Sequence, residues 1–420
     1  MTPLLGLALR SAWNRRFVLG LVVASIALST FLLLAIERIR ADVREGFAQS
    51  ISGTDLIVGP RTGSVQLLLY AVFRIGGATN TVRMESIDAV ARHRAVEWVV
   101  PLALGDTHRG HAVVATTAAY FDRFRHGDRK PLAFSAGARF AGLWDVVIGA
   151  DVAERLGYGL GQRLTLSHGD GAFQANDHAD KPFTVVGILA RTGTPVDRSL
   201  HISLEAMQAI HLDWAAGVPL PGQRIGADAA AAADLRPRTV NAALVGLKNR
   251  LAVFAVQRDV AAYEPEALMA ILPGVALDEL WRVIGAGEQA LLAVSALVAI
   301  VSLAGLVAVV LAGLEPRRRE LAILRAVGAG PRHVLALLLF EGLVVGLLGV
   351  ALGTLAAWLA VAGLGDAVAA RLGLVLSGTP VGAGEARLVG GLLAGALLAS
   401  LVPGYRAYRL SLADGLAPKA

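Results

Sequence analysis

Four long apolar runs dominate the pattern of hydrophobic and polar positions along the chain. A helix of about 20 apolar residues crosses a bilayer core of roughly 30 Å. The pattern therefore predicts four transmembrane helices, at residues 17–36, 287–314, 334–365 and 388–405. A signal peptide is the alternative for the first run. Its apolar core exceeds the usual ~7–15 residues and no small-residue cleavage site follows, so we expect a retained anchor.

Residues 37–286 separate the first apolar run from the second and are predicted to form a folded domain, because about 250 residues bury an ample core. Strand character is found at 96–104, 111–117, 144–149, 162–167, 183–190 and 239–247. Helical patterns lie at 150–157 and 204–211, the second with Ser203 at the N-cap position. The predicted fold class is an α-helical integral membrane protein with four transmembrane helices and a large α+β extracytoplasmic domain between helices 1 and 2.

Two charged helical patterns flank this domain. One covers 37–50, and the other covers part of 257–284, through YEPEALMAIL and LDELWRVI. Because each adjoins an apolar run, we expect them to continue the first and second spans outward as a stalk. The alanine-rich segment 227–234 is predicted to be a surface loop or a short helix, and 60–95 shows no pattern that we can interpret.

The charges of the short loops predict which side of the membrane each segment faces. Net charge is +3 over residues 1–16, +3 over 314–333, +2 over 405–420 and zero over 364–387. Short cytoplasmic loops carry the excess of Lys and Arg. The predicted cytoplasmic segments are therefore 1–16, 315–333 and 406–420, and the domain and the 366–387 loop are predicted to lie outside. Three arginines oppose this orientation, namely Arg38, Arg40 and Arg44, but long translocated regions largely escape the rule.

Composition agrees with a membrane protein. Hydrophobic residues make up 55% of the chain and charged residues 17%, against roughly 25% charge in soluble domains. The pI of about 9.9 would suit a nucleic-acid-binding protein, but much of the basic excess lies beside apolar runs, where it marks the cytoplasmic side. The chain has no cysteine, which excludes disulfides, thiolate chemistry and Cys-based zinc sites.

Polar and glycine positions inside the spans are candidate functional or packing sites. Glu341 lies about seven residues, or roughly 10 Å, into the third span. An acid within a span is a functional hypothesis, but at this depth it reaches the interface or a neighbouring helix, and we favour a structural role. Because G-x-x-x-G pairs let helices approach closely, we assign helix packing, with a dimer interface as one setting, to Gly342, Gly346, Gly349 and Gly353.

One polar loop carries potential metal ligands. HGDGAFQANDHAD (168–180) gathers imidazoles and carboxylates, which bind zinc or copper. His168, Asp170 and His178 are the candidate ligands, although a solvated loop is the simpler interpretation and no metal or other cofactor is expected. The G-x-G-x-G at 157–161 lacks the preceding strand and following helix of a phosphate site, so a turn explains it. No Ser-His-Asp or H-E-x-x-H arrangement predicts a catalytic site.

Four motifs carry a resemblance to a known family. WDVVIGADVAERLGYGLGQRLTLS (144–167) and FTVVGILARTGTPVDRSLHISLEAMQAI (183–210) resemble the periplasmic core domain of MacB-type permeases. ELAILRAVGA (320–329) and YRAYRLSLADGL (405–416) resemble an FtsX-like permease module, which would cover 287–410. The order of one span, a large outer domain and three further spans is also similar. The chain thus resembles ABC transporter permeases of the MacB, FtsX and LolC type.

The resemblance implies a non-catalytic permease subunit of the bacterial inner membrane. Its implied partners are a cytoplasmic ABC ATP-binding subunit, a second copy or a related permease, membrane lipids and, as an option, a periplasmic adaptor or substrate protein, with no nucleic acid. The chain departs from MacB itself because it lacks G-x-x-x-x-G-K-[ST], and no Gly is followed by Lys. ATP would therefore be bound by the separate partner.

Three functions compete. The first couples ATP hydrolysis to periplasmic conformational change for export, efflux or lipoprotein or lipid extraction. The alternative is an FtsX-like mechanotransmitter that regulates a cell-envelope enzyme, a type whose outer domain is generally smaller. A membrane-anchored periplasmic enzyme or sensor would leave three spans and the 315–333 loop unexplained.

The resemblance also assigns the 315–333 loop to coupling with the ATPase. Its basic residues obey the positive-inside rule, and its helical apolar pattern, LAILRAVGA, suits contact with a cytoplasmic partner. The residues assigned to this contact are Arg317, Arg318, Arg319, Glu320, Leu321, Ile323, Leu324, Arg325 and Gly328.

The absence of cysteine allows a direct test of topology. We expect Asp170→Cys to react with a membrane-impermeant thiol reagent added to cells with a permeabilised outer membrane and an intact inner one, and Arg325→Cys to react only after lysis, because the loop charges place these residues on opposite sides. Labelling of the Arg325 variant without labelling of the Asp170 variant in unlysed cells would reverse the predicted orientation.

Overall fold

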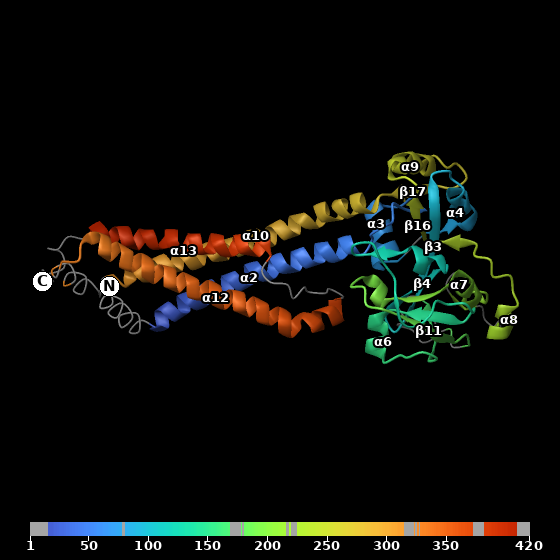
Figure 1. Ribbon diagram of the computed structural model, residues 1–420, viewed down its shortest axis with the longest axis horizontal. Coiled ribbons are helices and arrows are strands. Elements are labelled where there is room, and N and C mark those ends of the chain that lie inside the picture. The colour runs from blue at the N-terminus through green and yellow to red at the C-terminus, as the bar shows by residue number, and fades with distance from the viewer. Residues whose placement is uncertain are drawn as a thin grey trace. The chain divides into compact units, whose positions relative to one another are not determined.

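The computed structural model divides the chain into two compact units (Figure 1). One comprises Met1–Val43 and Gly285–Ala420, and the other comprises Arg44–Ile284. The structure describes residues 16–77, 80–168, 178, 180–215, 218–219, 225–314, 323, 326, 328–372 and 382–409. Two helices, α2 (Arg16–Gln49) and α10 (Pro273–Ala312), each contribute residues to both units.

Within the described residues, four helices are long and apolar enough to cross a membrane. They are α2, α10, α12 (Pro331–Leu372) and α13 (Ala383–Arg409). Lipid offers no partner for backbone N–H and C=O groups, so a crossing segment must satisfy them internally, as a helix does. These helices, with an α+β domain between the first and the second, confirm the fold class predicted from the sequence.

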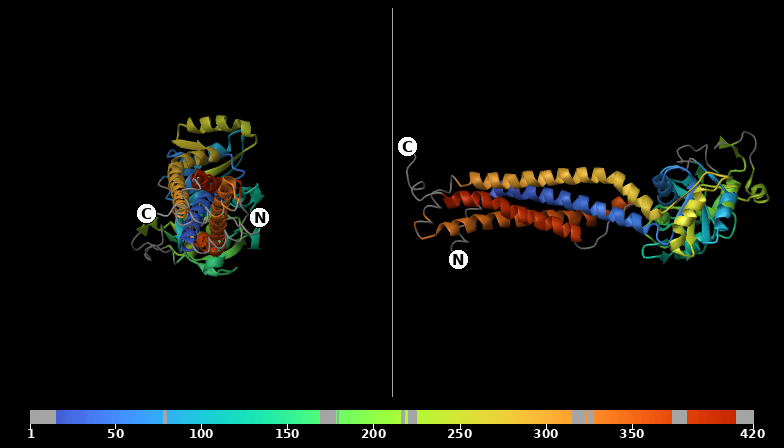
Figure 2. Two further views of the ribbon diagram at one scale, coloured as in Figure 1. Left: turned by 90° about the vertical axis from the view of Figure 1, so that its left-hand side faces the viewer. Right: turned by 90° about the horizontal axis from the view of Figure 1, so that it is seen from above.

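Small residues bring α12 and α13 together, and the two helices lie side by side in Figure 1 and Figure 2. A Cβ on Gly342 would collide with the side chain of Ser400, and a Cβ on Gly346 would lie 2.7 Å from the Cβ of Ala396. Small residues four positions apart let helix backbones approach until dispersion forces hold them, because lipid supplies no hydrophobic drive for association.

A second glycine pair on α12 faces α2. A Cβ on Gly349 would lie 2.7 Å from Ile26, and a Cβ on Gly353 would collide with the backbone carbonyl of Ala27. The two G-x-x-x-G pairs therefore serve two different neighbours in the same chain.

Hydroxyl groups link α2 to α10. The Ser302 hydroxyl lies 2.9 Å from that of Ser25 and 2.7 Å from that of Ser29, both within hydrogen-bond distance. Interhelical hydrogen bonds of this kind contribute on the order of 0.6 kcal/mol each in membrane proteins. The contact fixes the register of the two helices more than it adds stability.

Two of the arginines that oppose the positive-inside rule have local partners. Arg38 pairs with Glu385 at the start of α13, with 3.2 Å between Nε and Oε1, and both side chains are nearly buried. Arg40 pairs with Glu37, one turn earlier on α2, at 2.8 Å. Both arginines are thus paired with carboxylates of the same unit. This pairing gives them a structural role that does not depend on which side of the membrane they face.

The second unit is built on a sheet of 11 strands among the described residues. Its main path runs β17–β1–β16–β3–β4–β12–β8–β11–β7, with β10 paired to β3 and β9 to β11. The pairs β4–β12 and β8–β11 are parallel, and the others are antiparallel. The strands are β1 (Leu56–Pro60), β3 (Val96–His108), β4 (His111–Thr116), β7 (Phe134–Gly137), β8 (Asp145–Ile148), β9 (Arg163–Leu164), β10 (Ser167–His168), β11 (Phe183–Leu189), β12 (Leu200–Ser203), β16 (Ala242–Leu247) and β17 (Leu268–Ile271).

Three short two-stranded pairings complete the β structure described. They are β2 (Val82–Arg83) with β15 (Thr239–Val240), β5 (Arg125–His126) with β6 (Lys130–Pro131), and β13 (Trp214–Ala215) with β14 (Val218–Pro219). The remaining helices are α3 (Ser64–Leu68), the π-helix η1 (Leu69–Phe73), α4 (Met84–Ala91), α5 (Ala119–Arg123), α6 (Ala150–Leu156), η3 (Pro195–Arg198), α7 (Leu204–Ile210), α8 (Ala227–Ala231), η4 (Arg250–Ala252) and α9 (Val253–Ala261).

Hydrophobic side chains cover both faces of the large sheet. In β1, Leu56 and Val58 belong to one buried cluster and Ile57 to another, because successive side chains of a strand point to opposite faces. Residues of α4, α6, α7 and α9 complete the first cluster. Residues of α3, η1, α5 and the first turns of α10 complete the second, so α10 starts inside the core of this domain.

Most elements predicted from the sequence are confirmed. The predicted strands contain β4, β8, β11 and β16, and the one at 96–104 covers most of β3, which runs on to His108. The helix at 150–157 is α6, and the alanine-rich segment contains α8. Ser203 caps α7 as predicted, because its hydroxyl accepts a hydrogen bond from the Ala206 N–H at 3.0 Å.

Two predictions of local structure are wrong. The YEPEALMAIL segment is not a helix, because Leu268–Ile271 forms β17 and pairs with β1. Its residues favour a helix intrinsically, but pairing and the burial of Leu268 and Ala270 override that preference. The predicted strand at 162–167 is divided between β9 and β10. The region 60–95, which shows no interpretable pattern, holds α3, η1 and α4.

Alanine substitution at two glycines of α12 tests the packing. We expect Gly353→Ala to lower the thermal unfolding temperature of the detergent-solubilised protein, because a methyl group there overlaps the Ala27 carbonyl and overpacking costs about 1–3 kcal/mol. A Cβ on Gly363 meets no described atom within 4 Å, so Gly363→Ala should be neutral or stabilising by roughly 0.5–1 kcal/mol. Equal unfolding temperatures for the two variants would contradict close packing of α2 on α12.

Candidate functional site

Strand pairing places Asp106 opposite His168. In the antiparallel pair β3–β10, Ser167 faces Thr107 and His168 faces Asp106. Side chains of residues directly opposite one another in such a pair lie within contact distance. The register of β3 against β4 shifts between Leu104 and Thr107, and a bulge of this kind re-aims the side chains beside it. The Asp106 carboxylate is buried, and its Oδ1 lies 2.9 Å from His168 Nδ1.

The end of α7 supplies a second histidine. α7 begins after its Ser203 cap and ends at Ile210, and His211 is the residue that follows. His211 Nδ1 lies 2.9 Å from the Met207 carbonyl oxygen, one turn earlier. A carbonyl oxygen only accepts, so Nδ1 carries the proton. His211 Nε2 then faces the strand pair, 3.1 Å from His168 Nδ1 and 3.5 Å from Asp106 Oδ1.

A third histidine is held by its own backbone. The His178 N–H donates to the Leu166 carbonyl at 2.8 Å, and the His178 carbonyl accepts from the Lys181 N–H at 3.1 Å. Its ring is buried and packs on Trp214, with 4.6 Å between ring centroids. Trp214 also contacts the rings of His168 and His211, so one indole covers all three imidazoles.

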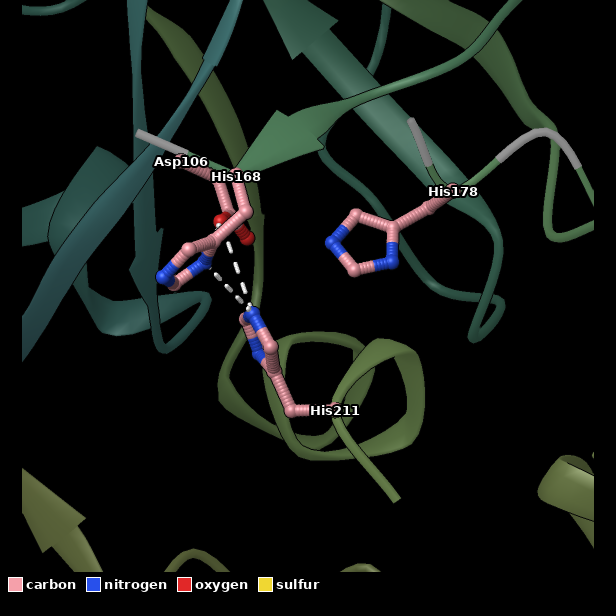
Figure 3. A group of neighbouring side chains, drawn as sticks. All are labelled: Asp106, His168, His178 and His211. Atoms are coloured by element: carbon pink, nitrogen blue, oxygen red, sulfur yellow. Dashed lines mark hydrogen bonds and ion pairs between the residues drawn. The ribbon is translucent and has the colours of Figure 1, made fainter. Parts of the chain in front are cut away.

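The four side chains form a group whose members could together hold a metal ion. Asp106, His168, His178 and His211 each offer one ligand atom, and all four atoms lie within 4.8 Å of one another. Figure 3 shows Asp106, His168 and His211 in mutual contact and one ring nitrogen of His178 directed toward them. We name this group the His3Asp cluster.

Charges within the cluster act on each other. Burial would raise the pKa of Asp106, but hydrogen bonds from His168 and His211 outweigh it and lower the pKa to about 2. Burial lowers the pKa of His178 to about 4. Burial would also lower the pKa of His211, but the Asp106 carboxylate reverses this and raises it. At neutral pH Asp106 is therefore ionised, and His178 is neutral with a nitrogen lone pair free to bind.

The structure changes the sequence-based list of ligands. His168 and His178 come together as the sequence suggests, whereas Asp170 lies outside the described residues. Asp180 instead pairs with Lys181, at 3.2 Å. Sequence reasoning missed Asp106 and His211, which are 62 and 43 residues from His168 along the chain. An aspartate two residues after a predicted strand and a histidine at the end of a predicted helix were the available signals.

Two family models match the chain. A MacB-like periplasmic core domain matches residues 17–262, and an FtsX-like permease C-terminal region matches residues 292–412. The first alone covers more than half of the sequence. The chain belongs to the MacB/FtsX-type family of ABC transporter permeases.

Two solved structures are similar to part of this permease. The periplasmic region of MacB from Actinobacillus actinomycetemcomitans shares 10% identity with a TM-score of 0.33, over 55% of this chain and 94% of that one. The extracellular domain of the noncanonic ABC-type transporter YknZ from Gram-positive bacteria shares 14% identity with a TM-score of 0.29, over 52% of this chain and 99% of that one. No curated protein matches the permease.

Family membership fixes the general role. Permeases of this family are generally non-catalytic subunits that work with a cytoplasmic ABC ATPase. The family and the four membrane-length helices point to an inner-membrane protein with a periplasmic domain. The orientation of the termini remains a prediction.

Most predicted coupling residues of the permease lie outside the described residues, namely Arg317, Arg318, Arg319, Glu320, Leu321, Leu324 and Arg325. Ile323 is exposed, and Gly328 has a φ of 105°, a conformation that favours glycine. Glu341 is half-buried in α12. The roles assigned to all of these residues remain predictions.

Proposed function

We propose that this permease converts ATP hydrolysis in a separate cytoplasmic subunit into movement of its periplasmic domain, and so drives export, efflux or extraction of a lipoprotein or lipid. The observation that carries the proposal is the continuity of α2 and α10. These helices have 34 and 40 residues, or about 50 and 60 Å at 1.5 Å per residue. A bilayer core needs only about 30 Å. Both helices run on into the second unit, α2 from Arg44 to Gln49 and α10 from Ile284 back to Pro273.

The two helices are tied to each other in both units. In the first unit, Ser302 of α10 bonds Ser25 and Ser29 of α2. In the second, the rings of Phe47 and Trp281 meet edge to face at 5.4 Å between centroids. Arg44 also lies over the Trp281 ring, at 5.3 Å, where a cation–π contact contributes about 0.5–1 kcal/mol. A displacement of one helix is therefore expected to carry the other with it.

The polar groups of the spans support a mechanical role over a hydrophilic pathway. In the described part of the four helices, the buried polar side chains between the helix ends are Ser29, Thr30, Ser295, Ser302 and Ser400. Each hydroxyl lies within hydrogen-bond distance of the backbone carbonyl four residues earlier. A path for a hydrophilic substrate needs polar groups that face a wetted cavity, and these hydroxyls are engaged by their own helices.

The sequence supports a separate energy source. The chain has no P-loop motif, so nothing in it provides the backbone cradle and lysine that hold nucleotide phosphates. The 315–333 loop is the contact that we assign to the ATPase, with Leu321, Ile323 and Leu324 as apolar anchors. Buried anchors carry most interface energy, while rim charges contribute little.

A matched pair of substitutions tests this contact. We expect affinity-tagged permease purified from its own membranes to retain an ATP-hydrolysing subunit. Leu324→Asp should reduce the retained subunit at least about tenfold, because a carboxylate replaces a buried anchor, whereas Arg317→Ala should leave it nearly unchanged. The bound subunit is quantified by mass spectrometry together with ATPase activity.

Both variants must reach the membrane at wild-type levels and keep the wild-type labelling topology, so that loss of the subunit is not a loss of insertion. Wild-type permease that hydrolyses ATP in a preparation free of any partner would contradict the proposed division of labour. If Leu324→Asp retains the partner fully, the loop does not anchor the ATPase, and its basic residues only determine membrane orientation.

A further inference from the structure

We propose that the His3Asp cluster is a binding site for a divalent transition-metal ion of the zinc class. Asp106, His168, His178 and His211 come from four separate segments: β3, β10, the stretch before β11 and the end of α7. The cluster lies wholly within the second unit. The inference is independent of the proposed transport function.

The close contacts within the cluster show where a cation would lie. His211 Nδ1 donates its hydrogen to the Met207 carbonyl, so in the neutral imidazole Nε2 presents a lone pair to its neighbours. His168 Nδ1 lies within hydrogen-bond distance of both Asp106 Oδ1 and His211 Nε2, and His211 Nε2 lies 3.5 Å from Asp106 Oδ1. Either protons or one metal ion can hold these three atoms together, and a metal ion uses the lone pairs that the deprotonated nitrogens provide.

Unpartnered polar atoms give an independent indication of a missing ligand. Three buried atoms of the cluster have no hydrogen-bond partner in the described part of the chain. They are the two ring nitrogens of His178 and Oδ2 of Asp106. His178 is only 1% exposed. An unsatisfied buried polar group destabilises the folded state, because it loses its hydrogen bonds to water without replacing them. A metal ion would engage one nitrogen of His178 directly and so remove part of this cost.

The spacing of the ligand atoms suits a tetrahedral ion. Zinc binds imidazole nitrogen and carboxylate oxygen at about 2.0–2.2 Å, which places tetrahedral ligand atoms about 3.3–3.5 Å apart. The three contacts among Asp106, His168 and His211 measure 2.9, 3.1 and 3.5 Å. Because all four ligand atoms lie within 4.8 Å of one another, the His178 ring needs to move inward by about 1.5 Å or less to complete the set.

Residues around the cluster orient its side chains, as the residues behind metal ligands do in known metal sites. Metal-binding histidines usually donate the other ring N–H to a carbonyl or carboxylate, which fixes the tautomer, and His211 donates to Met207 in this way. Trp214 packs against all three imidazoles and limits their rotation. The nearby buried Lys181 ammonium is paired with Asp213 at 2.8 Å and Asp180 at 3.2 Å, so its charge is compensated and does not expel a cation.

The donor set selects the class of metal. Three imidazoles and one carboxylate suit Zn²⁺, Cu²⁺ or Ni²⁺, whereas Ca²⁺ and Mg²⁺ require oxygen ligands. Four protein ligands leave no open position on a tetrahedral ion, which is typical of a structural site. By binding all four ligands, the ion would link the end of α7 and the stretch before β11 to the β3–β10 pair of the periplasmic domain.

Metal binding by the full-length protein tests the proposal. The chain is purified in detergent, stripped with a chelator and titrated with Zn²⁺ in competition with a chromophoric chelator, while Co²⁺ serves as a spectroscopic probe of geometry. We expect one Zn²⁺ per chain, the intense visible absorption of tetrahedral Co²⁺, and a higher unfolding temperature with Zn²⁺. Mg²⁺ and Ca²⁺ should not compete.

Ligand variants and a matched control locate the site. His178→Ala and His211→Ala should each weaken Zn²⁺ binding by more than about 100-fold and abolish the thermal shift. His93→Ala is the control, because His93 also pairs with a carboxylate, that of Asp259 at 3.1 Å, but forms no larger ligand group among the described residues. It should bind Zn²⁺ like the wild type.

The unfolding temperature in the presence of chelator shows whether each variant is folded, because a folded variant should match the metal-free wild type. If a histidine variant does not fold, Asp106→Asn, which keeps the shape of the side chain, replaces it as the ligand variant. Absence of saturable Zn²⁺ binding in the wild type overturns the proposal. Equal affinity in wild type and ligand variants also overturns it, because the ion is then bound elsewhere.

Discussion

The unbroken backbones of α2 and α10 are the constraint on which the rest of this permease depends. Inside a bilayer a helix must keep its backbone hydrogen bonds, since lipid offers no substitute. Here the same helices continue beyond their apolar stretches, to Gln49 and back to Pro273. α10 starts with Ala276, Leu277 and Leu280 buried in the core of the α+β domain. A motion in the spans therefore has a continuous covalent and hydrogen-bonded route into that core.

The domain is organised by strand register. The registers of the β3–β16 and β1–β17 pairings determine which side chains lie on each face of the large sheet. The register of β3–β10 places His168 opposite Asp106. The His3Asp cluster therefore depends on the fold in a specific way: a slip of one residue in β3–β10 would turn one of these side chains to the opposite face. A metal ion at the cluster would in turn hold that register, because its ligands come from both strands.

Sequence alone predicted the architecture well because apolar length and strand alternation are local signals. It also found Ser203 as the cap of α7 and two of the four cluster residues. It failed where long-range pairing decides the outcome: β17 forms from helix-favouring residues because β1 offers a partner. Asp106 and His211 were missed for the same reason, since only the fold brings them to His168. The glycines of α12 were predicted as packing residues, but their division between α13 and α2 requires coordinates.

Hydrogen exchange of the assembled complex shows directly whether α2 and α10 transmit force to the α+β domain. ATP should change the exchange of domain amides in the wild type. A Gly-Ser-Gly-Ser insertion after Arg44 in α2, with a second after Ile284 in α10, should abolish that change while ATP hydrolysis by the partner continues. The same insertion between the exposed Gly76 and Gly77 should leave it intact. An undiminished ATP response in the protein with both helices interrupted would contradict the account.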